Sequence, residues 1–123
     1  MRVFKTRWFA KFVQKEKIGA VRLLEAVARA GRGSIDADLG KGLVKQRVAR
    51  QGGGRSGGYR TIFAFRSDSR AVFLYGFGKN ERDNISSSDL DRLREAAAEY
   101  LALAWRDIDE ALNSGKLTEI ENE

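Results

Sequence analysis

The stretch Leu43-Val44-Lys45-Gln46-Arg47-Val48-Ala49-Arg50 indicates how the central part of this chain folds. Its pattern has a period of two, which is typical of a β-strand because successive side chains of a strand point to opposite faces. The residues that share the first face are Leu43, Lys45, Arg47 and Ala49, and those on the second are Val44, Gln46, Val48 and Arg50. Two cations on one strand face repel each other unless an anion such as a phosphate lies between them.

Further strands are predicted on both sides of this one. Gln51–Gly58 holds five glycines in eight residues and predicts a loop, and Tyr59–Arg66 then has a β-rich composition. After a turn at residues 67–69, Ala71–Phe77 is almost wholly apolar, so we expect this strand inside the sheet, covered on both faces. The apolar pair Val3-Phe4 predicts a short first strand.

Apolar residues at helical spacing predict a hairpin of two helices before the sheet residues. The first helix follows Thr6, and the second runs from about Ile18 to Ala30 with Gly31 as its C-cap. We expect one buried stripe on the second helix, made of Val21, Leu24, Val27 and Ala28. The glycines and short polar residues that follow, up to Gly42, predict turns in place of regular structure.

One long helix is predicted near the C-terminus. Ser87 or Ser88 caps its start, Gly115 follows its end, and it spans about 26 residues. Both tryptophans lie in helical stripes and are expected to anchor the core: Trp8 and Trp105. The acidic tail over residues 116–123 is expected to fray.

The composition excludes several classes of enzyme. The chain has 123 residues, which fits one domain over residues 1–115 and the tail. It contains no Cys and no His, which excludes thiol enzymes, thiolate and imidazole metal sites, and Ser-His-Asp triads. Its apolar runs are too short for a membrane span or an export signal, so we expect a cytoplasmic protein.

Charge is distributed unevenly along the chain. The net charge is +6 and the pI is about 9.9, which favours an anionic partner. Residues 1–60 carry 15 basic and 4 acidic side chains, whereas residues 86–123 carry 4 basic and 10 acidic ones. Either the two halves attract each other within one domain, or a basic polyanion-binding surface lies opposite an acidic one.

The basic residues form three short blocks that could meet on one face. Lys45 and Arg47 form the first, and Arg60, on the strand expected to pair across the glycine loop, forms the second. The third, Lys79 and Arg82, follows the apolar strand. Taken singly, each is also typical of a solvated strand face or a charged loop. Together they would surround a phosphodiester whose attack generates extra negative charge.

The glycine loop resembles a nucleotide-binding loop only faintly. Gly54-Arg55-Ser56 lacks the lysine of such loops and is predicted to join two strands, whereas a nucleotide loop leads into a helix. We interpret it as a hairpin tip whose Arg50 and Arg55 contact a nucleic-acid backbone through charge. Tyr59 and Asn80, beside the catalytic candidates, are further candidates for RNA contacts.

Three segments together resemble the RelE/ParE superfamily of toxin-antitoxin toxins, with closest similarity to a RelE-like, HigB-like branch. These segments are Leu43–Arg50, Arg55–Thr61 and Tyr75–Arg82, and the order and spacing are similar over about residues 1–112. The resemblance implies an α+β microbial ribonuclease fold, with an antiparallel sheet, an N-terminal helical hairpin and a long C-terminal helix.

The resemblance also implies an activity. Such a toxin cleaves messenger RNA, often on the ribosome, by attack of the RNA's own 2′-hydroxyl, and it requires no metal or cofactor. The implied catalytic residues are the basic ones, namely Lys45, Arg47, Arg60, Lys79 and Arg82. The resemblance further implies a cognate antitoxin, expected as a helix-turn-helix protein that covers the basic face or displaces the last helix.

This chain departs from the RelE pattern at three positions. Asn80 stands where RelE has an arginine, Ser86 where it has a tyrosine, and Arg47 where it has a lysine. A guanidinium is a poor general base, because its pKa is above about 12. The candidates for moving the proton are therefore left open, and they are Lys45, Lys79, Glu81 and Asp83.

Two other functions remain as alternatives. ParE-type toxins poison DNA gyrase without cutting RNA, but they generally lack the basic cluster. A nucleic-acid-binding domain without catalysis would bind RNA with a steep salt dependence and no turnover.

Overall fold

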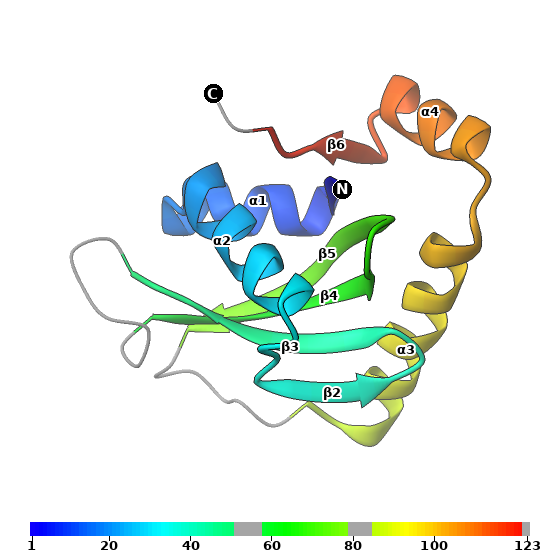
Figure 1. Cartoon of the computed structure of the whole chain (residues 1–123). Coiled ribbons are helices and arrows are strands. Elements are labelled where there is room, and N and C mark those ends of the chain that lie inside the picture. Colours follow the sequence, from blue (N-terminus) through cyan, green and yellow to red (C-terminus); the bar gives the residue numbers. More distant parts are fainter. Residues whose placement is uncertain (51–57, 79–84, 122–123) are drawn as a thin grey trace.

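The computed structural model describes residues 1–50, 58–78 and 85–121, and in this part of the chain six strands form one sheet (Figure 1). The strands are β1 (Arg2–Thr6), β2 (Ala37–Gly40), β3 (Leu43–Val48), β4 (Tyr59–Arg66), β5 (Arg70–Gly78) and β6 (Leu117–Glu119). Their order in the sheet is β2-β3-β4-β5-β1-β6. The predicted strands at residues 43–48, 59–66 and 71–77 are confirmed, and β5 lies inside the sheet as expected.

The sheet is mixed, whereas an antiparallel sheet was expected. β1 runs parallel to β5, and the other neighbouring pairs of strands are antiparallel. The chain leaves β1 through two helices and three strands before it returns as β5, and such a long connection allows the two strands to point the same way. The direction of β1 relative to β5 therefore depends on this long connection, and the residue pattern of β1 alone does not reveal it.

Two helices cover one face of the sheet, α1 (Arg7–Glu16) and α2 (Ala20–Gly31) (Figure 1). The Thr6 side chain accepts a hydrogen bond from the Phe9 N–H and caps α1, so the predicted start is confirmed. The core on this face is formed by aromatic and aliphatic side chains of both layers, among them Phe9, Val13, Leu23, Val27, Phe63 and Phe73.

The buried stripe of α2 differs from the prediction. Leu23, Ala26, Val27 and Ala30 are buried, and Val21 is 68% exposed. Both stripes have helical spacing, and the packing of α2 on β3 selects the one that is rotated toward the sheet. Gly31 is the last helical residue, and the positive φ falls at Gly33.

The predicted C-terminal helix is divided in two. The first part, α3 (Ser87–Ala102), begins after the capping residue Ser86, and the second part is α4 (Trp105–Ser114). Leu103 has extended backbone angles between them. Helical periodicity continues through this break, so the pattern alone did not reveal it.

Arg70 and Trp105 stabilise the break between α3 and α4. The Arg70 guanidinium lies 4.0 Å from the centre of the Trp105 ring, and its Nη1 donates to the Tyr100 carbonyl at 2.7 Å. A guanidinium on an indole face is a favourable cation–π contact. Trp105 is 43% exposed and Trp8 is 47% exposed, so neither is the buried core anchor that was expected.

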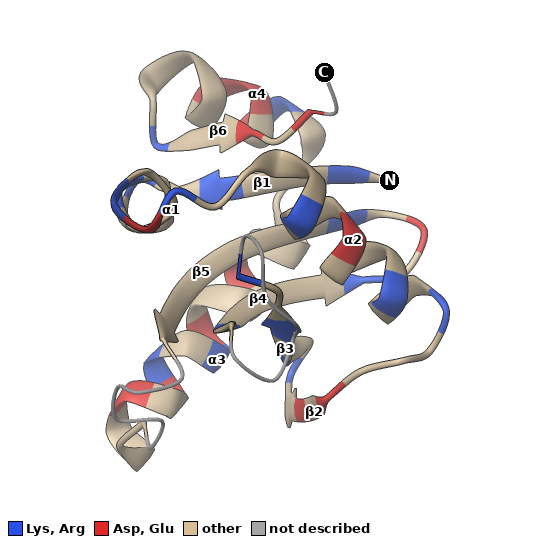
Figure 2. Cartoon of the chain, turned by 90° about the vertical axis from the view of Figure 1, so that its left-hand side faces the viewer, with Lys and Arg blue, Asp and Glu red and all other residues tan. Residues whose placement is uncertain are grey.

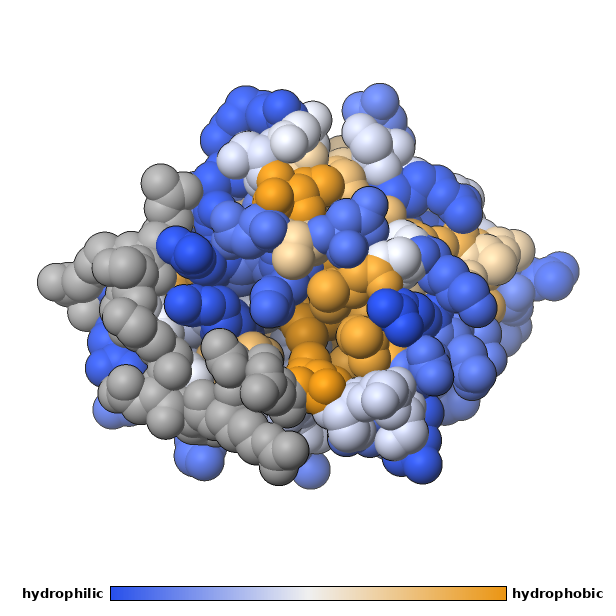
Figure 3. All heavy atoms as spheres, turned by 90° about the horizontal axis from the view of Figure 1, so that it is seen from below, coloured by the Kyte–Doolittle hydropathy of each residue, from blue (hydrophilic) through white to orange (hydrophobic). Residues whose placement is uncertain are grey.

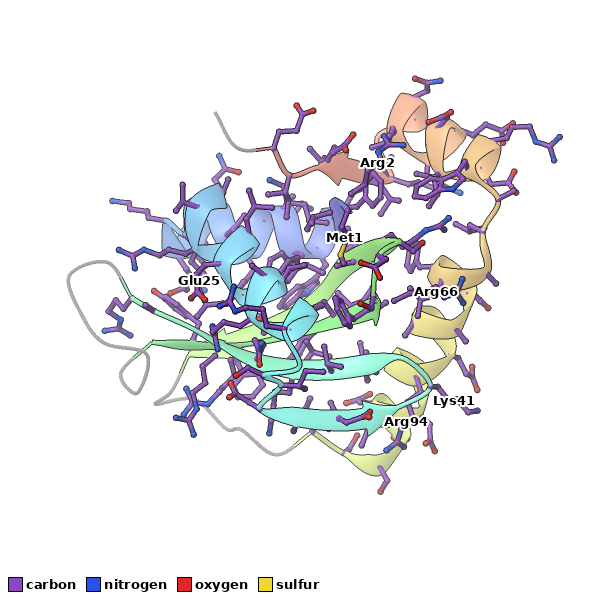
Figure 4. All side chains as sticks on the ribbon, viewed as in Figure 1. Met1, Arg2, Glu25, Lys41, Arg66 and Arg94 are labelled. Carbon is purple, nitrogen blue, oxygen red and sulfur yellow. The ribbon has the colours of Figure 1, made fainter. Side chains whose placement is uncertain are left out.

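Two segments expected to be irregular are strands. Residues 117–119, expected in a frayed tail, form β6 on β1, and both Leu117 and Ile120 are buried. Residues 37–40, expected in a loop, form the short edge strand β2 on β3. Arg94 of α3 donates to the Leu39 carbonyl at 2.6 Å and holds this edge in place (Figure 4). Short edge strands are held by main-chain pairing and need no apolar pattern.

Hydropathy adds one finding about the helices. Within residues 1–50, 58–78 and 85–121, every helix is too short or too polar to cross a membrane.

Gln46 connects β3 to the layer of α1 and α2. Its side chain is fully buried, and its amide nitrogen donates to the carbonyls of Ala26 and Ser34 at 3.0 and 2.9 Å. Its amide oxygen accepts from the Asp36 N–H at 2.9 Å. These hydrogen bonds fix which residues of β3 face α2.

Replacement of Gln46 by leucine should destabilise the fold. The change removes three hydrogen bonds made by a fully buried side chain, so we expect a loss of about 2 to 4 kcal/mol in the free energy of unfolding. Urea denaturation measures it. Gln14→Leu on the exposed side of α1 is the control and should stay within about 0.5 kcal/mol. Equal effects of the two substitutions would contradict this account of Gln46.

A second prediction concerns the ion pair between Arg2 and Glu119, which joins β1 to β6. Arg2 donates twice to the Glu119 carboxylate, at 3.0 and 2.8 Å, and these hydrogen bonds lower the pKa of Glu119 from its ordinary value of 4.5. A lowered pKa means that the ion pair stabilises the fold above pH 4.5, and that this contribution disappears as the pH falls through the lowered value.

Glu119→Gln should therefore be less stable than the wild type at neutral pH, by about 1 kcal/mol or less because the pair is partly exposed. The difference should narrow as the pH falls below 4.5 and the carboxylate of Glu119 becomes protonated. Urea denaturation at several pH values measures it, and a difference that stays constant with pH would contradict the assignment.

Candidate functional site

Lys45, Arg47 and Arg60 lie on one face of the sheet, the face that packs against α3. Leu43, on the same side of β3 as Lys45 and Arg47, belongs to the core beneath α3 and α4. Arg47 is directly opposite Arg60 in the register of β3 and β4. The structure thus brings together three of the five predicted cations.

Apolar side chains of β4 and β5 lie beside Lys45, Arg47 and Arg60, which we call the cationic row. Arg60 is in register with Phe77 of β5, and Lys45 is in register with Ile62 of β4, which is itself in register with Tyr75. Phe77 and Ile62 are buried. Figure 3 shows this side of the molecule, where hydrophilic side chains gather beside the residues drawn in grey and hydrophobic ones lie in the middle.

Arg60 has an unsatisfied donor. Its side chain is half-buried, and its Nη1 is buried without a hydrogen-bond partner among the residues that the structure describes. Buried polar groups are nearly always hydrogen-bonded, so such a group calls for an explanation. A guanidinium beside an apolar wall attracts anions strongly, because the field of a charge is screened less next to a low-dielectric surface.

The main chain of Arg47 is held by two charged side chains. Its N–H donates to Asp36 Oδ2 at 2.7 Å, and its carbonyl accepts a hydrogen bond from Arg29 Nη2. Arg29 is buried and also donates to the Glu25 carboxylate at 2.6 Å. β2 pairs with Leu43, Val44 and Lys45 of β3, so Asp36 and Arg29 hold the main chain of Arg47 just beyond the end of this pairing.

Sequence reasoning missed Arg29 and Asp36. The available signal was a charged residue, Arg29, at helical spacing from Ala26 and on the side of α2 that faces the sheet. Asp36 gave no such signal, because aspartate is common in turns whatever its partner.

Tyr59 and Arg50 lie apart from the three cations. The Tyr59 ring is 6% exposed in the core beneath α1 and α2, on the opposite face from Arg60. Its hydroxyl donates to the Glu16 carbonyl at 3.4 Å, and burial raises its pKa. Arg50 is exposed, with its guanidinium 5.5 Å from the centre of the Tyr59 ring. The structure therefore does not bring the Tyr59 ring to the face of Lys45, Arg47 and Arg60.

Several candidate residues lie outside the described part of the chain. They are Arg55 in the glycine loop, and Lys79, Asn80, Glu81, Arg82 and Asp83 after β5. β5 ends at Gly78, one residue after the partner of Arg60.

Charged residues of both signs are distributed over the molecule. Figure 2 shows Lys and Arg on α1, β1 and β3, and Asp and Glu on β2, α3 and α4. The arrangement of the three cations suits a phosphate group. Guanidinium groups supply paired donors with fixed geometry to a phosphate, whereas a lysine amine is in general also a candidate for proton transfer.

Comparisons with known proteins identify the family of this chain. A search of curated proteins finds no match. The family model described as the RelE toxin of the RelE / RelB toxin-antitoxin system matches residues 1–120, which is nearly the whole chain. With its α+β architecture, helical layers and mixed sheet, the chain belongs to the RelE family of toxins from toxin-antitoxin systems.

Proposed function

We propose that this toxin is an endoribonuclease that cleaves messenger RNA, on the ribosome, and so stops translation. The observation that supports this proposal is the row of Lys45, Arg47 and Arg60 on one sheet face, with the buried Nη1 of Arg60 that has no hydrogen-bond partner within residues 1–50, 58–78 and 85–121. Family membership supports a toxin, and the cationic row favours RNA cleavage over a role without catalysis.

The reaction needs no group from outside the protein and the RNA. The 2′-oxygen of a ribose attacks the adjacent phosphorus and forms a 2′,3′-cyclic phosphate, while the bond from phosphorus to the 5′-oxygen breaks. One proton leaves the 2′-hydroxyl and one is delivered to the 5′-oxygen. Lys45, Lys79, Glu81 and Asp83 remain the candidates for these transfers, and the last three lie outside the described residues.

The role of the arginines is electrostatic. The transition state carries one more negative charge on its non-bridging oxygens than the bound phosphodiester does. Arg47 and Arg60 face each other across β3 and β4, so both guanidinium groups are able to donate to the same phosphate. Groups that bind the transition state more tightly than the substrate raise the rate of the chemical step.

Arg60→Ala should reduce cleavage strongly. We expect a loss of about 10² to 10³ in the rate constant of single-turnover cleavage, because a fixed donor to the developing charge is removed. The measurement uses a messenger RNA on ribosomes, with identification of cyclic phosphate at the cut ends. Arg66→Ala is the matched control, because Arg66 is exposed at the other end of the same strand (Figure 4).

If the Arg60→Ala variant cleaves RNA at the wild-type rate, the assignment of Arg60 to the catalytic site is wrong. Double-strand breaks that depend on gyrase, without cleaved RNA, would establish the ParE-type alternative. Binding of RNA that weakens steeply with salt, without any cut product, would establish a binding module.

Replacement of Arg60 by leucine should leave the fold intact or make it more stable. It removes a half-buried charge whose Nη1 has no partner in the described part of the chain, and so relieves a desolvation cost. Arg60→Leu should therefore unfold at an equal or higher urea concentration than the wild type. Lost activity together with retained stability is typical of a residue selected for function. A large loss of stability would show instead that Arg60 is a structural residue.

The family implies a cognate antitoxin as the partner. We propose that its inhibitory part covers the face of Lys45, Arg47 and Arg60 or displaces the C-terminal helices, and that it belongs to a helix-turn-helix protein. Action on ribosome-bound messenger RNA would place the toxin in the cytoplasm.

A further inference from the structure

A groove of about 570 Å³ lies between α3 and α4, away from the cationic row. Its lining residues recur every three or four positions, with Ala96, Glu99 and Tyr100 from α3, Leu103 from the break after α3, and Asp107, Glu110, Ala111 and Ser114 from α4. Lys116 lies at one end. The break between the two helices creates this groove, because a continuous helix would have only one such row.

The floor of the groove is apolar and incompletely covered. Tyr100, Leu103 and Ala111 pack against the core beneath α3 and α4, yet each of them is only half-buried. Two adjacent helices that present half-buried apolar side chains to a shared groove form the type of surface on which a third, amphipathic helix packs.

The rim of the groove is acidic. Among the described residues, Glu99 and Glu110 form no ion pair, and Asp107 has only a contact of 3.9 Å with its neighbour Arg106. These carboxylates are not gathered around one point, because no group of three such residues in the described part of the chain could hold a metal ion. A negative rim repels RNA and attracts cationic side chains.

We propose that this groove binds a basic amphipathic helix of the antitoxin. The apolar side of that helix would lie on Tyr100, Leu103 and Ala111, and lysines or arginines at its flanks would pair with Glu99 and Glu110. This contact lies outside the proposed nuclease site, and its rim is acidic, whereas the nuclease site is basic. It therefore gives the antitoxin a second hold on the toxin, one that leaves the RNA-binding face open.

Charge reversal in the groove tests the proposal. The double variant Glu99→Lys with Glu110→Lys reverses the rim, and Glu95→Lys with Asp109→Lys makes the same change of charge on the same helices, outside the groove lining. Isothermal titration with the purified antitoxin encoded beside the toxin gives the Kd. We expect the groove variant to weaken binding at least tenfold and the control variant less than threefold. Cleavage of RNA by the free toxin should be unchanged in both.

A second measurement uses the wild-type chain and so does not depend on how the variants fold. Hydrogen exchange should slow in residues 96–103 and 107–114 when the antitoxin is added. Equal weakening by groove and control variants, or unchanged exchange in both segments, would overturn the proposal. It would also fail if sedimentation showed that the groove joins two copies of the toxin. If the groove variant weakens antitoxin binding as expected but the wild-type toxin does not cleave RNA, only the proposed nuclease function is contradicted.

Discussion

The register of β3 is the constraint on which the rest of the site depends. Gln46 is locked toward α2 by three hydrogen bonds, so its neighbours Lys45 and Arg47 must point to the opposite face. A slip of one residue would exchange the two faces of the strand and place two cations in the core. Asp36 and Arg29 add to this constraint, because they hold the N–H and carbonyl of Arg47 where β2 no longer pairs with the strand.

The two faces of the sheet are used differently. The face beneath α1 and α2 is filled by aromatic side chains, with Tyr59 among them, and it supplies much of the stability of the fold. On the other face, α3 and α4 cover only part of the sheet, and the ends of β3 and β4 carry Lys45, Arg47 and Arg60. The charges of the C-terminal helices complement this division, because their acidic groove is suited to a protein partner and repels nucleic acid.

Much of the central sheet was predictable from sequence, and the surrounding parts were less so. β3 has a period of two, β4 has a β-rich composition, and β5 has the apolar run of an inner strand. The opposition of Arg47 and Arg60 followed from these patterns and a hairpin connection. The parallel direction of β1, the break at Leu103 and the strand β6 depend on contacts between distant segments, which local patterns do not contain.

The candidate site was predictable to a similar extent. The alternation of side chains along a strand correctly placed Lys45 and Arg47 on one face. The same alternation places Tyr59 on the face opposite Arg60, and the expectation that Tyr59 contacts RNA overlooked this. Arg29 and Asp36 act through the main chain of Arg47, and such contacts are visible only in three dimensions.

The most direct test of the central claim is to observe the arginine side chains while RNA binds. The toxin, labelled with ¹⁵N, is titrated with an RNA whose 2′-hydroxyl at the cut site is replaced by hydrogen, and the Nε–H resonances are followed by NMR. The account predicts that the resonances of Arg47 and Arg60 shift together with one Kd while that of Arg66 stays in place. Saturation of the RNA without any shift at Arg47 and Arg60 would contradict it.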